Sequence, residues 1–176
     1  QAGIFPPSRL KPIRKRFKPQ SNNRDYKKRD DKPLLDELVK KKQLPVLYFC
    51  FSRKLCENKA RKSARRKLLN PQEMAAVHQV WDQAREEFNF DDERGALSEL
   101  KHQTLNGVAS HHAGMMPLHK EMVERLFAGA LLKVLYTTET FALGINMPAR
   151  AVIFDSLSKF DGVDFDYMRT RDFLQM

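Results

Sequence analysis

Three hydroxyl side chains at the end of an apolar run have the chemistry needed to bind a sugar-phosphate backbone. The run LKVLYT (132–137) is typical of a buried strand. The hydroxyls that follow its apolar part belong to Thr137, Thr138 and Thr140. Such side chains, beside exposed backbone amides, donate hydrogen bonds to phosphate oxygens. Gly144 would permit close backbone approach, and Asn146 adds an amide that could reach a ribose hydroxyl. Threonine also favours strands and caps helices, so both interpretations stand at this point.

A second candidate is Ser52, which follows the apolar run PVLYFCF (45–51). Eight Lys or Arg residues lie between Arg53 and Lys67. A hydroxyl and free amides at a helix N-terminus suit a phosphate oxygen. The alternative is that Ser52 is only an N-cap and that the charges form a solvated helix face.

A third candidate is the stretch SHHAGMMP (110–117). A metal site built from His111, His112 and His119 is disfavoured, because adjacent residues of a strand point to opposite faces. Gly114 is better explained as a place where the backbone must approach something closely. No Ser-His-Asp or Cys-His arrangement occurs, which argues against hydrolysis through a covalent nucleophile.

These candidates need a scaffold that brings strand ends together. Four apolar runs are continuous rather than alternating, as in strands buried on both faces of a parallel sheet; they are 45–51, 107–111, 132–137 and 150–154. Helical patterns separate them, which predicts an α/β fold with a central parallel sheet and helices on both faces. In open parallel sheets, ligands bind at the carboxyl ends of the strands.

Two helices between these runs have clear start signals. Asn70 is expected as an N-cap before Pro71, with Glu73 completing a capping box. The apolar stripe predicted for this helix consists of Met74, Val77, Val80, Trp81, Ala84 and Phe88. The next helix begins at Pro117 and ends near Gly129. Its predicted stripe is Leu118, Met122, Val123, Leu126 and Phe127. The role of residues 56–106 is open, with additional packing on the sheet as the simplest interpretation.

Charge divides the 176-residue chain, whose net charge is +10. Residues 1–33 hold 11 Lys and Arg against 3 Asp and Glu and show no periodicity, which predicts a basic linker or arm. The folded domain is expected over 34–176. Two cysteines six residues apart form no disulfide framework, which indicates a reducing, cytoplasmic or nuclear compartment. No run of about 18 apolar residues or signal peptide occurs, and Gln1 suggests a piece of a longer protein.

Nucleotide hydrolysis by this chain alone is not expected. No GxxxxGK[ST] phosphate loop occurs. The string DELV (36–39) superficially resembles an acidic Mg²⁺ motif, but its Lys-rich, helical context argues against that role.

Three blocks in order carry a resemblance to a known family: VLYFCFSRKLCE, VASHHAGMMPLHKEMVERLFAGALLKVLYTTETFALGINMPARAVIF and SLSKFDG. They resemble superfamily-2 DExH-box helicases, most closely the superkiller-type RNA helicases that serve the exosome. The resemblance covers roughly residues 45–176. It implies the second of two RecA-like domains, with a fold like that of P-loop NTPases but without the P-loop.

The resemblance also implies roles for individual residues. Contacts to single-stranded RNA are implied for Ser52, His112, Gly114, Thr138 and Thr140. Gly144 and Asn146 are implied to face ATP in the cleft with the first RecA-like domain, and Glu139 to couple the two sites. ATP and Mg²⁺ would be cofactors of the full-length enzyme, and an RNA-degradation complex is an expected partner.

The sequence departs from the family where it stops. Gln175 and Met176 match the start of motif VI, whose arginines are absent from this chain. We therefore expect no ATPase or unwinding activity from the fragment alone. Two alternatives remain: a DNA helicase domain of a sister family, and a non-enzymatic RNA- or protein-binding module.

Overall fold

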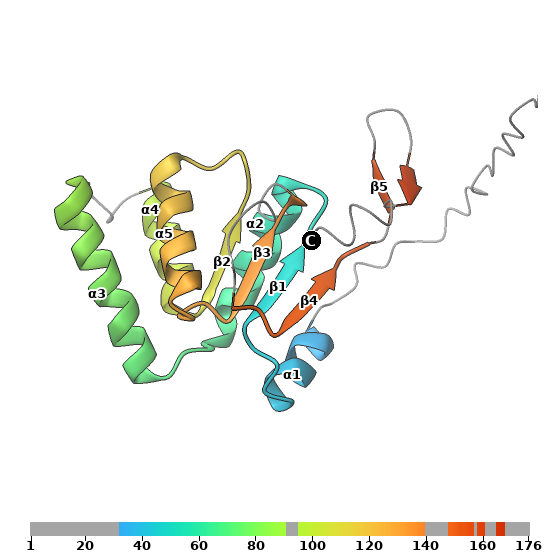
Figure 1. Ribbon diagram of the computed structural model, residues 1–176, viewed down its shortest axis with the longest axis horizontal. Coiled ribbons are helices and arrows are strands. Elements are labelled where there is room, and N and C mark those ends of the chain that lie inside the picture. The colour runs from blue at the N-terminus through green and yellow to red at the C-terminus, as the bar shows by residue number, and fades with distance from the viewer. Residues whose placement is uncertain (1–31, 91–94, 140–147, 157, 161–164, 168–176) are drawn as a thin grey trace, which may run out of the picture. The chain divides into compact units, whose positions relative to one another are not determined.

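The domain is built on a four-stranded parallel sheet. The computed structural model describes residues 32–90, 95–139, 148–156, 158–160 and 165–167. The strands are β1 (Val46–Phe49), β2 (Val108–His111), β3 (Val134–Thr137) and β4 (Ala151–Phe154), in the order β2-β3-β1-β4 (Figure 1). All four predicted strands are therefore confirmed, and so is their parallel arrangement.

The register of the sheet aligns the carboxyl ends of the strands. Phe49 of β1 pairs with Thr137 of β3 on one side and with Phe154 of β4 on the other. Thr137 pairs in turn with His111 of β2. Segments that follow these strands therefore start next to one another along a single edge, called the carboxyl edge below.

Helices cover both faces of the sheet. They are α1 (Lys32–Lys40), α2 (Arg53–Ser63), the short 3₁₀ helix η1 (Ala64–Arg66), α3 (Pro71–Phe88), α4 (Gly95–Leu105) and α5 (Pro117–Ala128). The predicted α/β class with helices on both faces is confirmed. The string DELV lies inside α1, as its context indicated. Among the described helices, none has the length and apolar character to cross a membrane.

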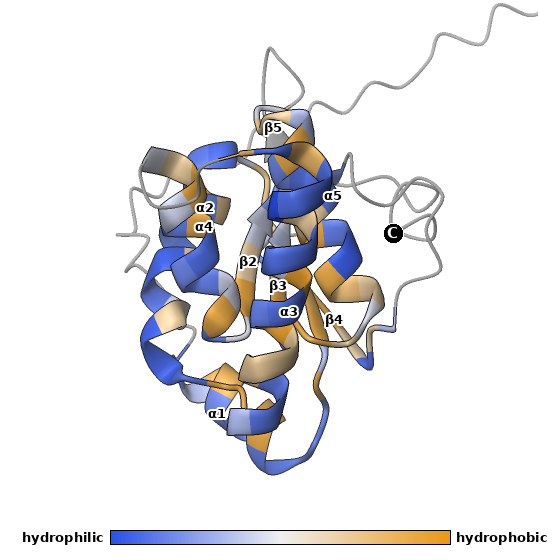
Figure 2. Ribbon diagram, turned by 90° about the vertical axis from the view of Figure 1, so that its left-hand side faces the viewer, coloured by the Kyte–Doolittle hydropathy of each residue, from blue (hydrophilic) through white to orange (hydrophobic). Residues whose placement is uncertain are grey.

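Alternation along the strands divides the core into two clusters. Leu47 and Phe49 of β1, with Ala109 and Leu135, face the cluster formed with α3, α4 and α5. Tyr48, which lies between Leu47 and Phe49 on β1, faces the opposite side of the sheet. It belongs to a second cluster, formed with α1 and α2. Figure 2 shows the apolar colour of the strands enclosed by helices with polar outer surfaces. Burial on both faces explains why the strand sequences are continuously apolar.

The start signals of the two central helices are confirmed. The Asn70 side chain accepts the amide of Glu73 at 2.8 Å, and the Glu73 carboxylate accepts the amide of Asn70 at 3.0 Å. Helix α5 starts at Pro117 and is capped at Gly129. In its stripe Met122, Val123, Leu126 and Phe127 are fully buried, and Leu118 is half-buried against the same core.

Two members of the predicted α3 stripe lie outside the core: Met74 is half-buried and Phe88 is exposed. Val77, Trp81 and Ala84 are fully buried, but Phe88 is 42% exposed. Phe88 lies in the last turn, where its ring contacts the Arg125 guanidinium at 5.2 Å. At this end of α3, an aromatic–cation contact at the surface replaces burial in the core.

The structure gives residues 56–106 a packing role. Helix α4 packs on β2, and α3 packs on α4 and α5. The Trp81 indole donates a buried hydrogen bond of 3.0 Å to the Thr104 hydroxyl, joining α3 to α4. An antiparallel pair, β5 (Ser158–Phe160) and β6 (Phe165–Tyr167), was not anticipated from the sequence.

Candidate nucleic-acid interface

The first residues beyond the strands continue the hydrogen bonding at the carboxyl edge. The Cys50 amide donates to the Thr137 carbonyl at 2.7 Å, and the Thr138 amide donates to the His111 carbonyl at 3.3 Å. The loops that carry Ser52, His112 and Thr138 therefore leave the sheet side by side. The structure brings these three predicted site residues to one edge.

Ser52 is the N-cap of α2. Its hydroxyl accepts the Leu55 amide at 3.2 Å, and its side chain is exposed. The helix-cap interpretation is confirmed, but it leaves anion binding possible. A hydroxyl has one donor proton besides its acceptor lone pairs. Ser52 can therefore accept from the helix and donate to an anion at once.

His112 is held inside the protein by both ring nitrogens. The ring is only 4% exposed. Its Nδ1 accepts the Gly114 amide at 3.2 Å, which assigns the proton to Nε2, and Nε2 donates to the Glu57 carboxylate at 3.0 Å. This geometry is that of a residue that fixes the shape of the loop and orients Gly114.

The neighbouring His111 points to the opposite face. Its Nε2 lies 2.8 Å from the Glu124 carboxylate of α5, whereas His112 reaches Glu57 of α2. Burial lowers the pKa of His111, although hydrogen bonding to Glu124 acts in the opposite direction. The two histidines diverge as the strand geometry predicted, so they cannot share one metal ion.

Gly114 lies against a residue that sequence reasoning missed. A Cβ atom built on Gly114 would meet Arg53 Nη1 at 3.1 Å, Arg53 Cδ at 3.2 Å and His112 Nδ1 at 3.2 Å. The structure shows a close contact at this glycine, and its partner is the Arg53 side chain. The available signal was a cation directly after Ser52 in the string FSRK.

The threonines after β3 differ in orientation. Thr137 is fully buried, and its hydroxyl donates to the Thr138 carbonyl at 3.1 Å. Thr138 is half-buried at the carboxyl edge, and Glu139 beyond it is exposed. The remaining predicted site residues, Thr140, Gly144 and Asn146, lie outside the described residues.

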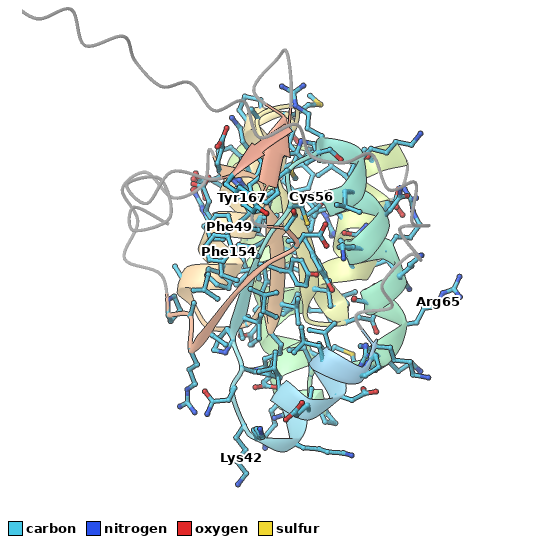
Figure 3. All side chains as sticks on the ribbon, turned by 90° about the vertical axis from the view of Figure 1, so that its right-hand side faces the viewer. Lys42, Phe49, Cys56, Arg65, Phe154 and Tyr167 are labelled. Carbon is cyan, nitrogen blue, oxygen red and sulfur yellow. The ribbon has the colours of Figure 1, made fainter. Side chains whose placement is uncertain are left out.

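The cations of α2 and η1 differ in whether a carboxylate pairs with them. Three of their cations have carboxylate partners: Lys59 with Asp155, Arg61 with Glu99, and Arg66 with Asp36. Within the described part of the chain, five exposed cations have no such partner; they are Arg53, Lys54, Lys62, Arg65 and Lys67. Figure 3 shows Arg65 extending into solvent. The solvated-face interpretation fits most of them, but Arg53 is placed at the site.

The two cysteines are reduced and buried. A hydrogen bond with Cys56, together with burial, raises the pKa of the Cys50 thiol. A raised pKa keeps the thiol protonated and unreactive. Cys50 is therefore part of the core cluster between the sheet and α2.

The fold and this edge define the class of protein: an α/β domain with a parallel sheet, of the RecA-like helicase type. No protein-family model matches the chain. Curated relatives identify the class more narrowly. The chain is 39% identical over 145 residues to "DExH-box ATP-dependent RNA helicase DExH11" of Arabidopsis thaliana, covering 81% of this chain.

Two human proteins are similar to the same degree. Identity is 39% over 146 residues with "Superkiller complex protein 2", covering 81% of this chain, and 38% over 135 residues with "Exosome RNA helicase MTR4", covering 75%. The chain spans only 11%, 12% and 13% of these three relatives. The chain belongs to the DExH-box RNA helicase family and aligns with a small part of each of these relatives.

Proposed function

We propose that this segment is the second RecA-like domain of an ATP-dependent RNA helicase and that its carboxyl edge binds the backbone of single-stranded RNA. The supporting observation is the shared register of β2, β3 and β1, which aligns the loops carrying His112, Thr138 and Ser52. The Ser52 and Thr138 side chains carry hydroxyls on adjacent loops, which suits contacts to the phosphates and sugars of one strand. Backbone contacts carry no base information, so sequence preference should be weak.

The residues at this edge divide into contacts and supports. Ser52 has an exposed hydroxyl, Thr138 lies half-buried at the same edge, and Thr140 is proposed to extend the same row. His112 positions the Gly114 amide through the bond to its Nδ1. In this proposal the histidine therefore contributes mainly by fixing the loop, and the RNA touches its neighbours.

The nucleotide half of the proposal concerns the longer protein. ATP with Mg²⁺ would bind between this domain and a first RecA-like domain, with Gly144 and Asn146 on this side. Glu139, exposed directly after Thr138, would couple the two sites. Residues 1–33 would form a basic arm ahead of the domain at 34–176. The names of the human relatives support an intracellular RNA-degradation complex as the partner of the whole enzyme.

RNA binding at the carboxyl edge can be tested by placing the same residue, Asp, at two helix N-caps, one at this edge and one away from it. Asp caps a helix about as well as Ser or Asn, so Ser52→Asp and Asn70→Asp should both fold and carry the same added charge. Asn70 lies near the opposite edge, where Glu73 bonds to Lys133, the residue before β3. Binding of a labelled mixed-sequence RNA strand would be measured by fluorescence anisotropy at low salt.

We expect Ser52→Asp to weaken RNA binding by about 10-fold or more, because a hydrogen bond to a charged group contributes about 1.5–3 kcal/mol. Asn70→Asp should stay within about twofold of wild type. Equal losses in the two variants would show non-specific attraction only. Tighter binding of a DNA strand of the same sequence would favour the sister-family DNA helicase instead.

A further inference from the structure

The space at Gly114 is filled by Arg53, and this contact explains the glycine. Gly114 does not adopt the left-handed conformation that requires glycine, so its backbone would accept alanine. The restriction is steric, because the guanidinium and Cδ of Arg53 lie 3.1 and 3.2 Å from where a Cβ would be. An added methyl group would press on the flexible Arg53 side chain and also on the His112 ring, whose Nδ1 lies 3.2 Å away.

We propose that Gly114 seats the Arg53 guanidinium at the carboxyl edge, where it contacts a phosphate of the bound RNA strand. The inference rests on the proposed RNA-binding function and adds a residue to it. Arg53 directly follows Ser52, so its guanidinium and the Ser52 hydroxyl belong to one loop. A planar guanidinium can form two parallel hydrogen bonds with a phosphate.

The contacts around Arg53 leave its charge available. In a helix, a carboxylate four positions further along is a natural partner for an arginine, and Glu57 occupies that position in α2. Glu57 instead accepts a hydrogen bond from His112 at 3.0 Å. No carboxylate of the described residues pairs with Arg53, unlike Lys59, Arg61 and Arg66 of the same segment.

His112 thus has two effects on this cation. Through Nδ1 it holds the Gly114 amide, which fixes the surface on which Arg53 lies. Through Nε2 it holds one oxygen of the Glu57 carboxylate, which lies one turn along α2 from Arg53. Residues of the loop after β2 and of α2 thus cooperate to present one unpaired guanidinium.

The test compares four variants of the chain in RNA binding across a salt series, with thermal unfolding to confirm that each is folded. Arg53→Ala should weaken binding by about 10-fold and reduce the log–log salt slope by about 0.7, the contribution of one phosphate on a single strand. Arg53→Lys keeps the charge and should keep the slope. Lys62→Ala removes an exposed charge from the same helix and should change affinity less than threefold.

Gly114→Ala tests the seat itself. We expect it to reproduce the loss and the slope change of Arg53→Ala, and the double variant should bind no more weakly than Arg53→Ala alone. An Arg53→Ala variant within twofold of wild type would overturn the proposal. So would full additivity of the two changes, because Gly114 would then act independently of Arg53. Absence of RNA binding by wild type, or equal effects of the two cap variants, would instead refute the proposed function.

Discussion

The two faces of the sheet are held by different interactions. The face covered by α3, α4 and α5 holds the larger apolar cluster, with Trp81, Phe49 and Phe127 fully buried, and its polar contacts include the Trp81–Thr104 bond between two helices. Phe49 also stacks on Phe154 at 5.2 Å, and Figure 3 shows these two rings close together. The face covered by α1 and α2 combines apolar residues with polar contacts inside the core.

Those polar contacts fix α2 to the sheet. The Ser63 and Tyr136 hydroxyls lie 2.6 Å apart in a buried position. Near the carboxyl edge, Lys59 pairs with Asp155 at 2.8 Å and donates to the Tyr48 hydroxyl at 3.1 Å. Apolar contacts are non-directional, whereas hydrogen bonds have a preferred geometry. The helix that starts at the proposed site is therefore positioned on the sheet by directional contacts as well as by apolar burial.

The largest expected effect is on the apolar face. Trp81→Ala removes a fully buried side chain and its bond to Thr104. We expect the free energy of unfolding to fall by about 3–5 kcal/mol, as for other large aromatic-to-alanine changes in cores. Urea unfolding of wild type and of the variant measures this difference in the free energy of unfolding. A loss below about 2 kcal/mol would contradict the view that apolar burial dominates this face.

A smaller effect is expected on the polar face. Tyr136→Phe leaves the Ser63 hydroxyl, which is buried, without the phenolic partner. Urea unfolding should show a loss of about 1–2 kcal/mol, because an unsatisfied buried polar group is costly. The double variant Tyr136→Phe with Ser63→Ala should be more stable than the sum of the single changes predicts. Strict additivity would show that the two hydroxyls do not interact.

The smallest effect concerns pH and the two adjacent histidines. Burial lowers the pKa of His111 in the folded protein. As the pH falls, this imidazole is therefore protonated at a higher pH in the unfolded state than in the folded state. Stability from this group is complete above the ordinary histidine pKa of about 6.5 and is lost below it. We would measure the free energy of unfolding of wild type and of His111→Asn at pH 7.5 and at pH 5.5. The fall between the two pH values should be larger for wild type by up to about 1 kcal/mol.

The comparison with the variant is necessary because burial also lowers the pKa of His119. His119 remains in both proteins, so its contribution cancels. The groups that act on His111 are Glu124, Lys120 and His112. Identical pH profiles for the two proteins would show that His111 has no role in the acid sensitivity of this face.

Much of the fold could be predicted because its signals are local. Each strand is a short apolar run, and the Asn70–Glu73 capping box lies within four residues. Phe88 fits the same helical periodicity but is exposed, because periodicity does not show which turns of a helix other elements cover. The β5-β6 pair was missed because its strands are only three residues long. The order of the strands follows from the crossovers and needed the structure.

The sequence by itself determined the helicase family, the parallel sheet, and the loops on which Ser52, His112, Gly114 and Thr138 lie. Only the tertiary structure decided what these residues do to one another. It showed that both nitrogens of His112 are engaged, one by Glu57 55 positions away, and that Gly114 admits Arg53. The reason is physical: these contacts join distant segments whose side chains meet only when the sheet aligns the strand ends.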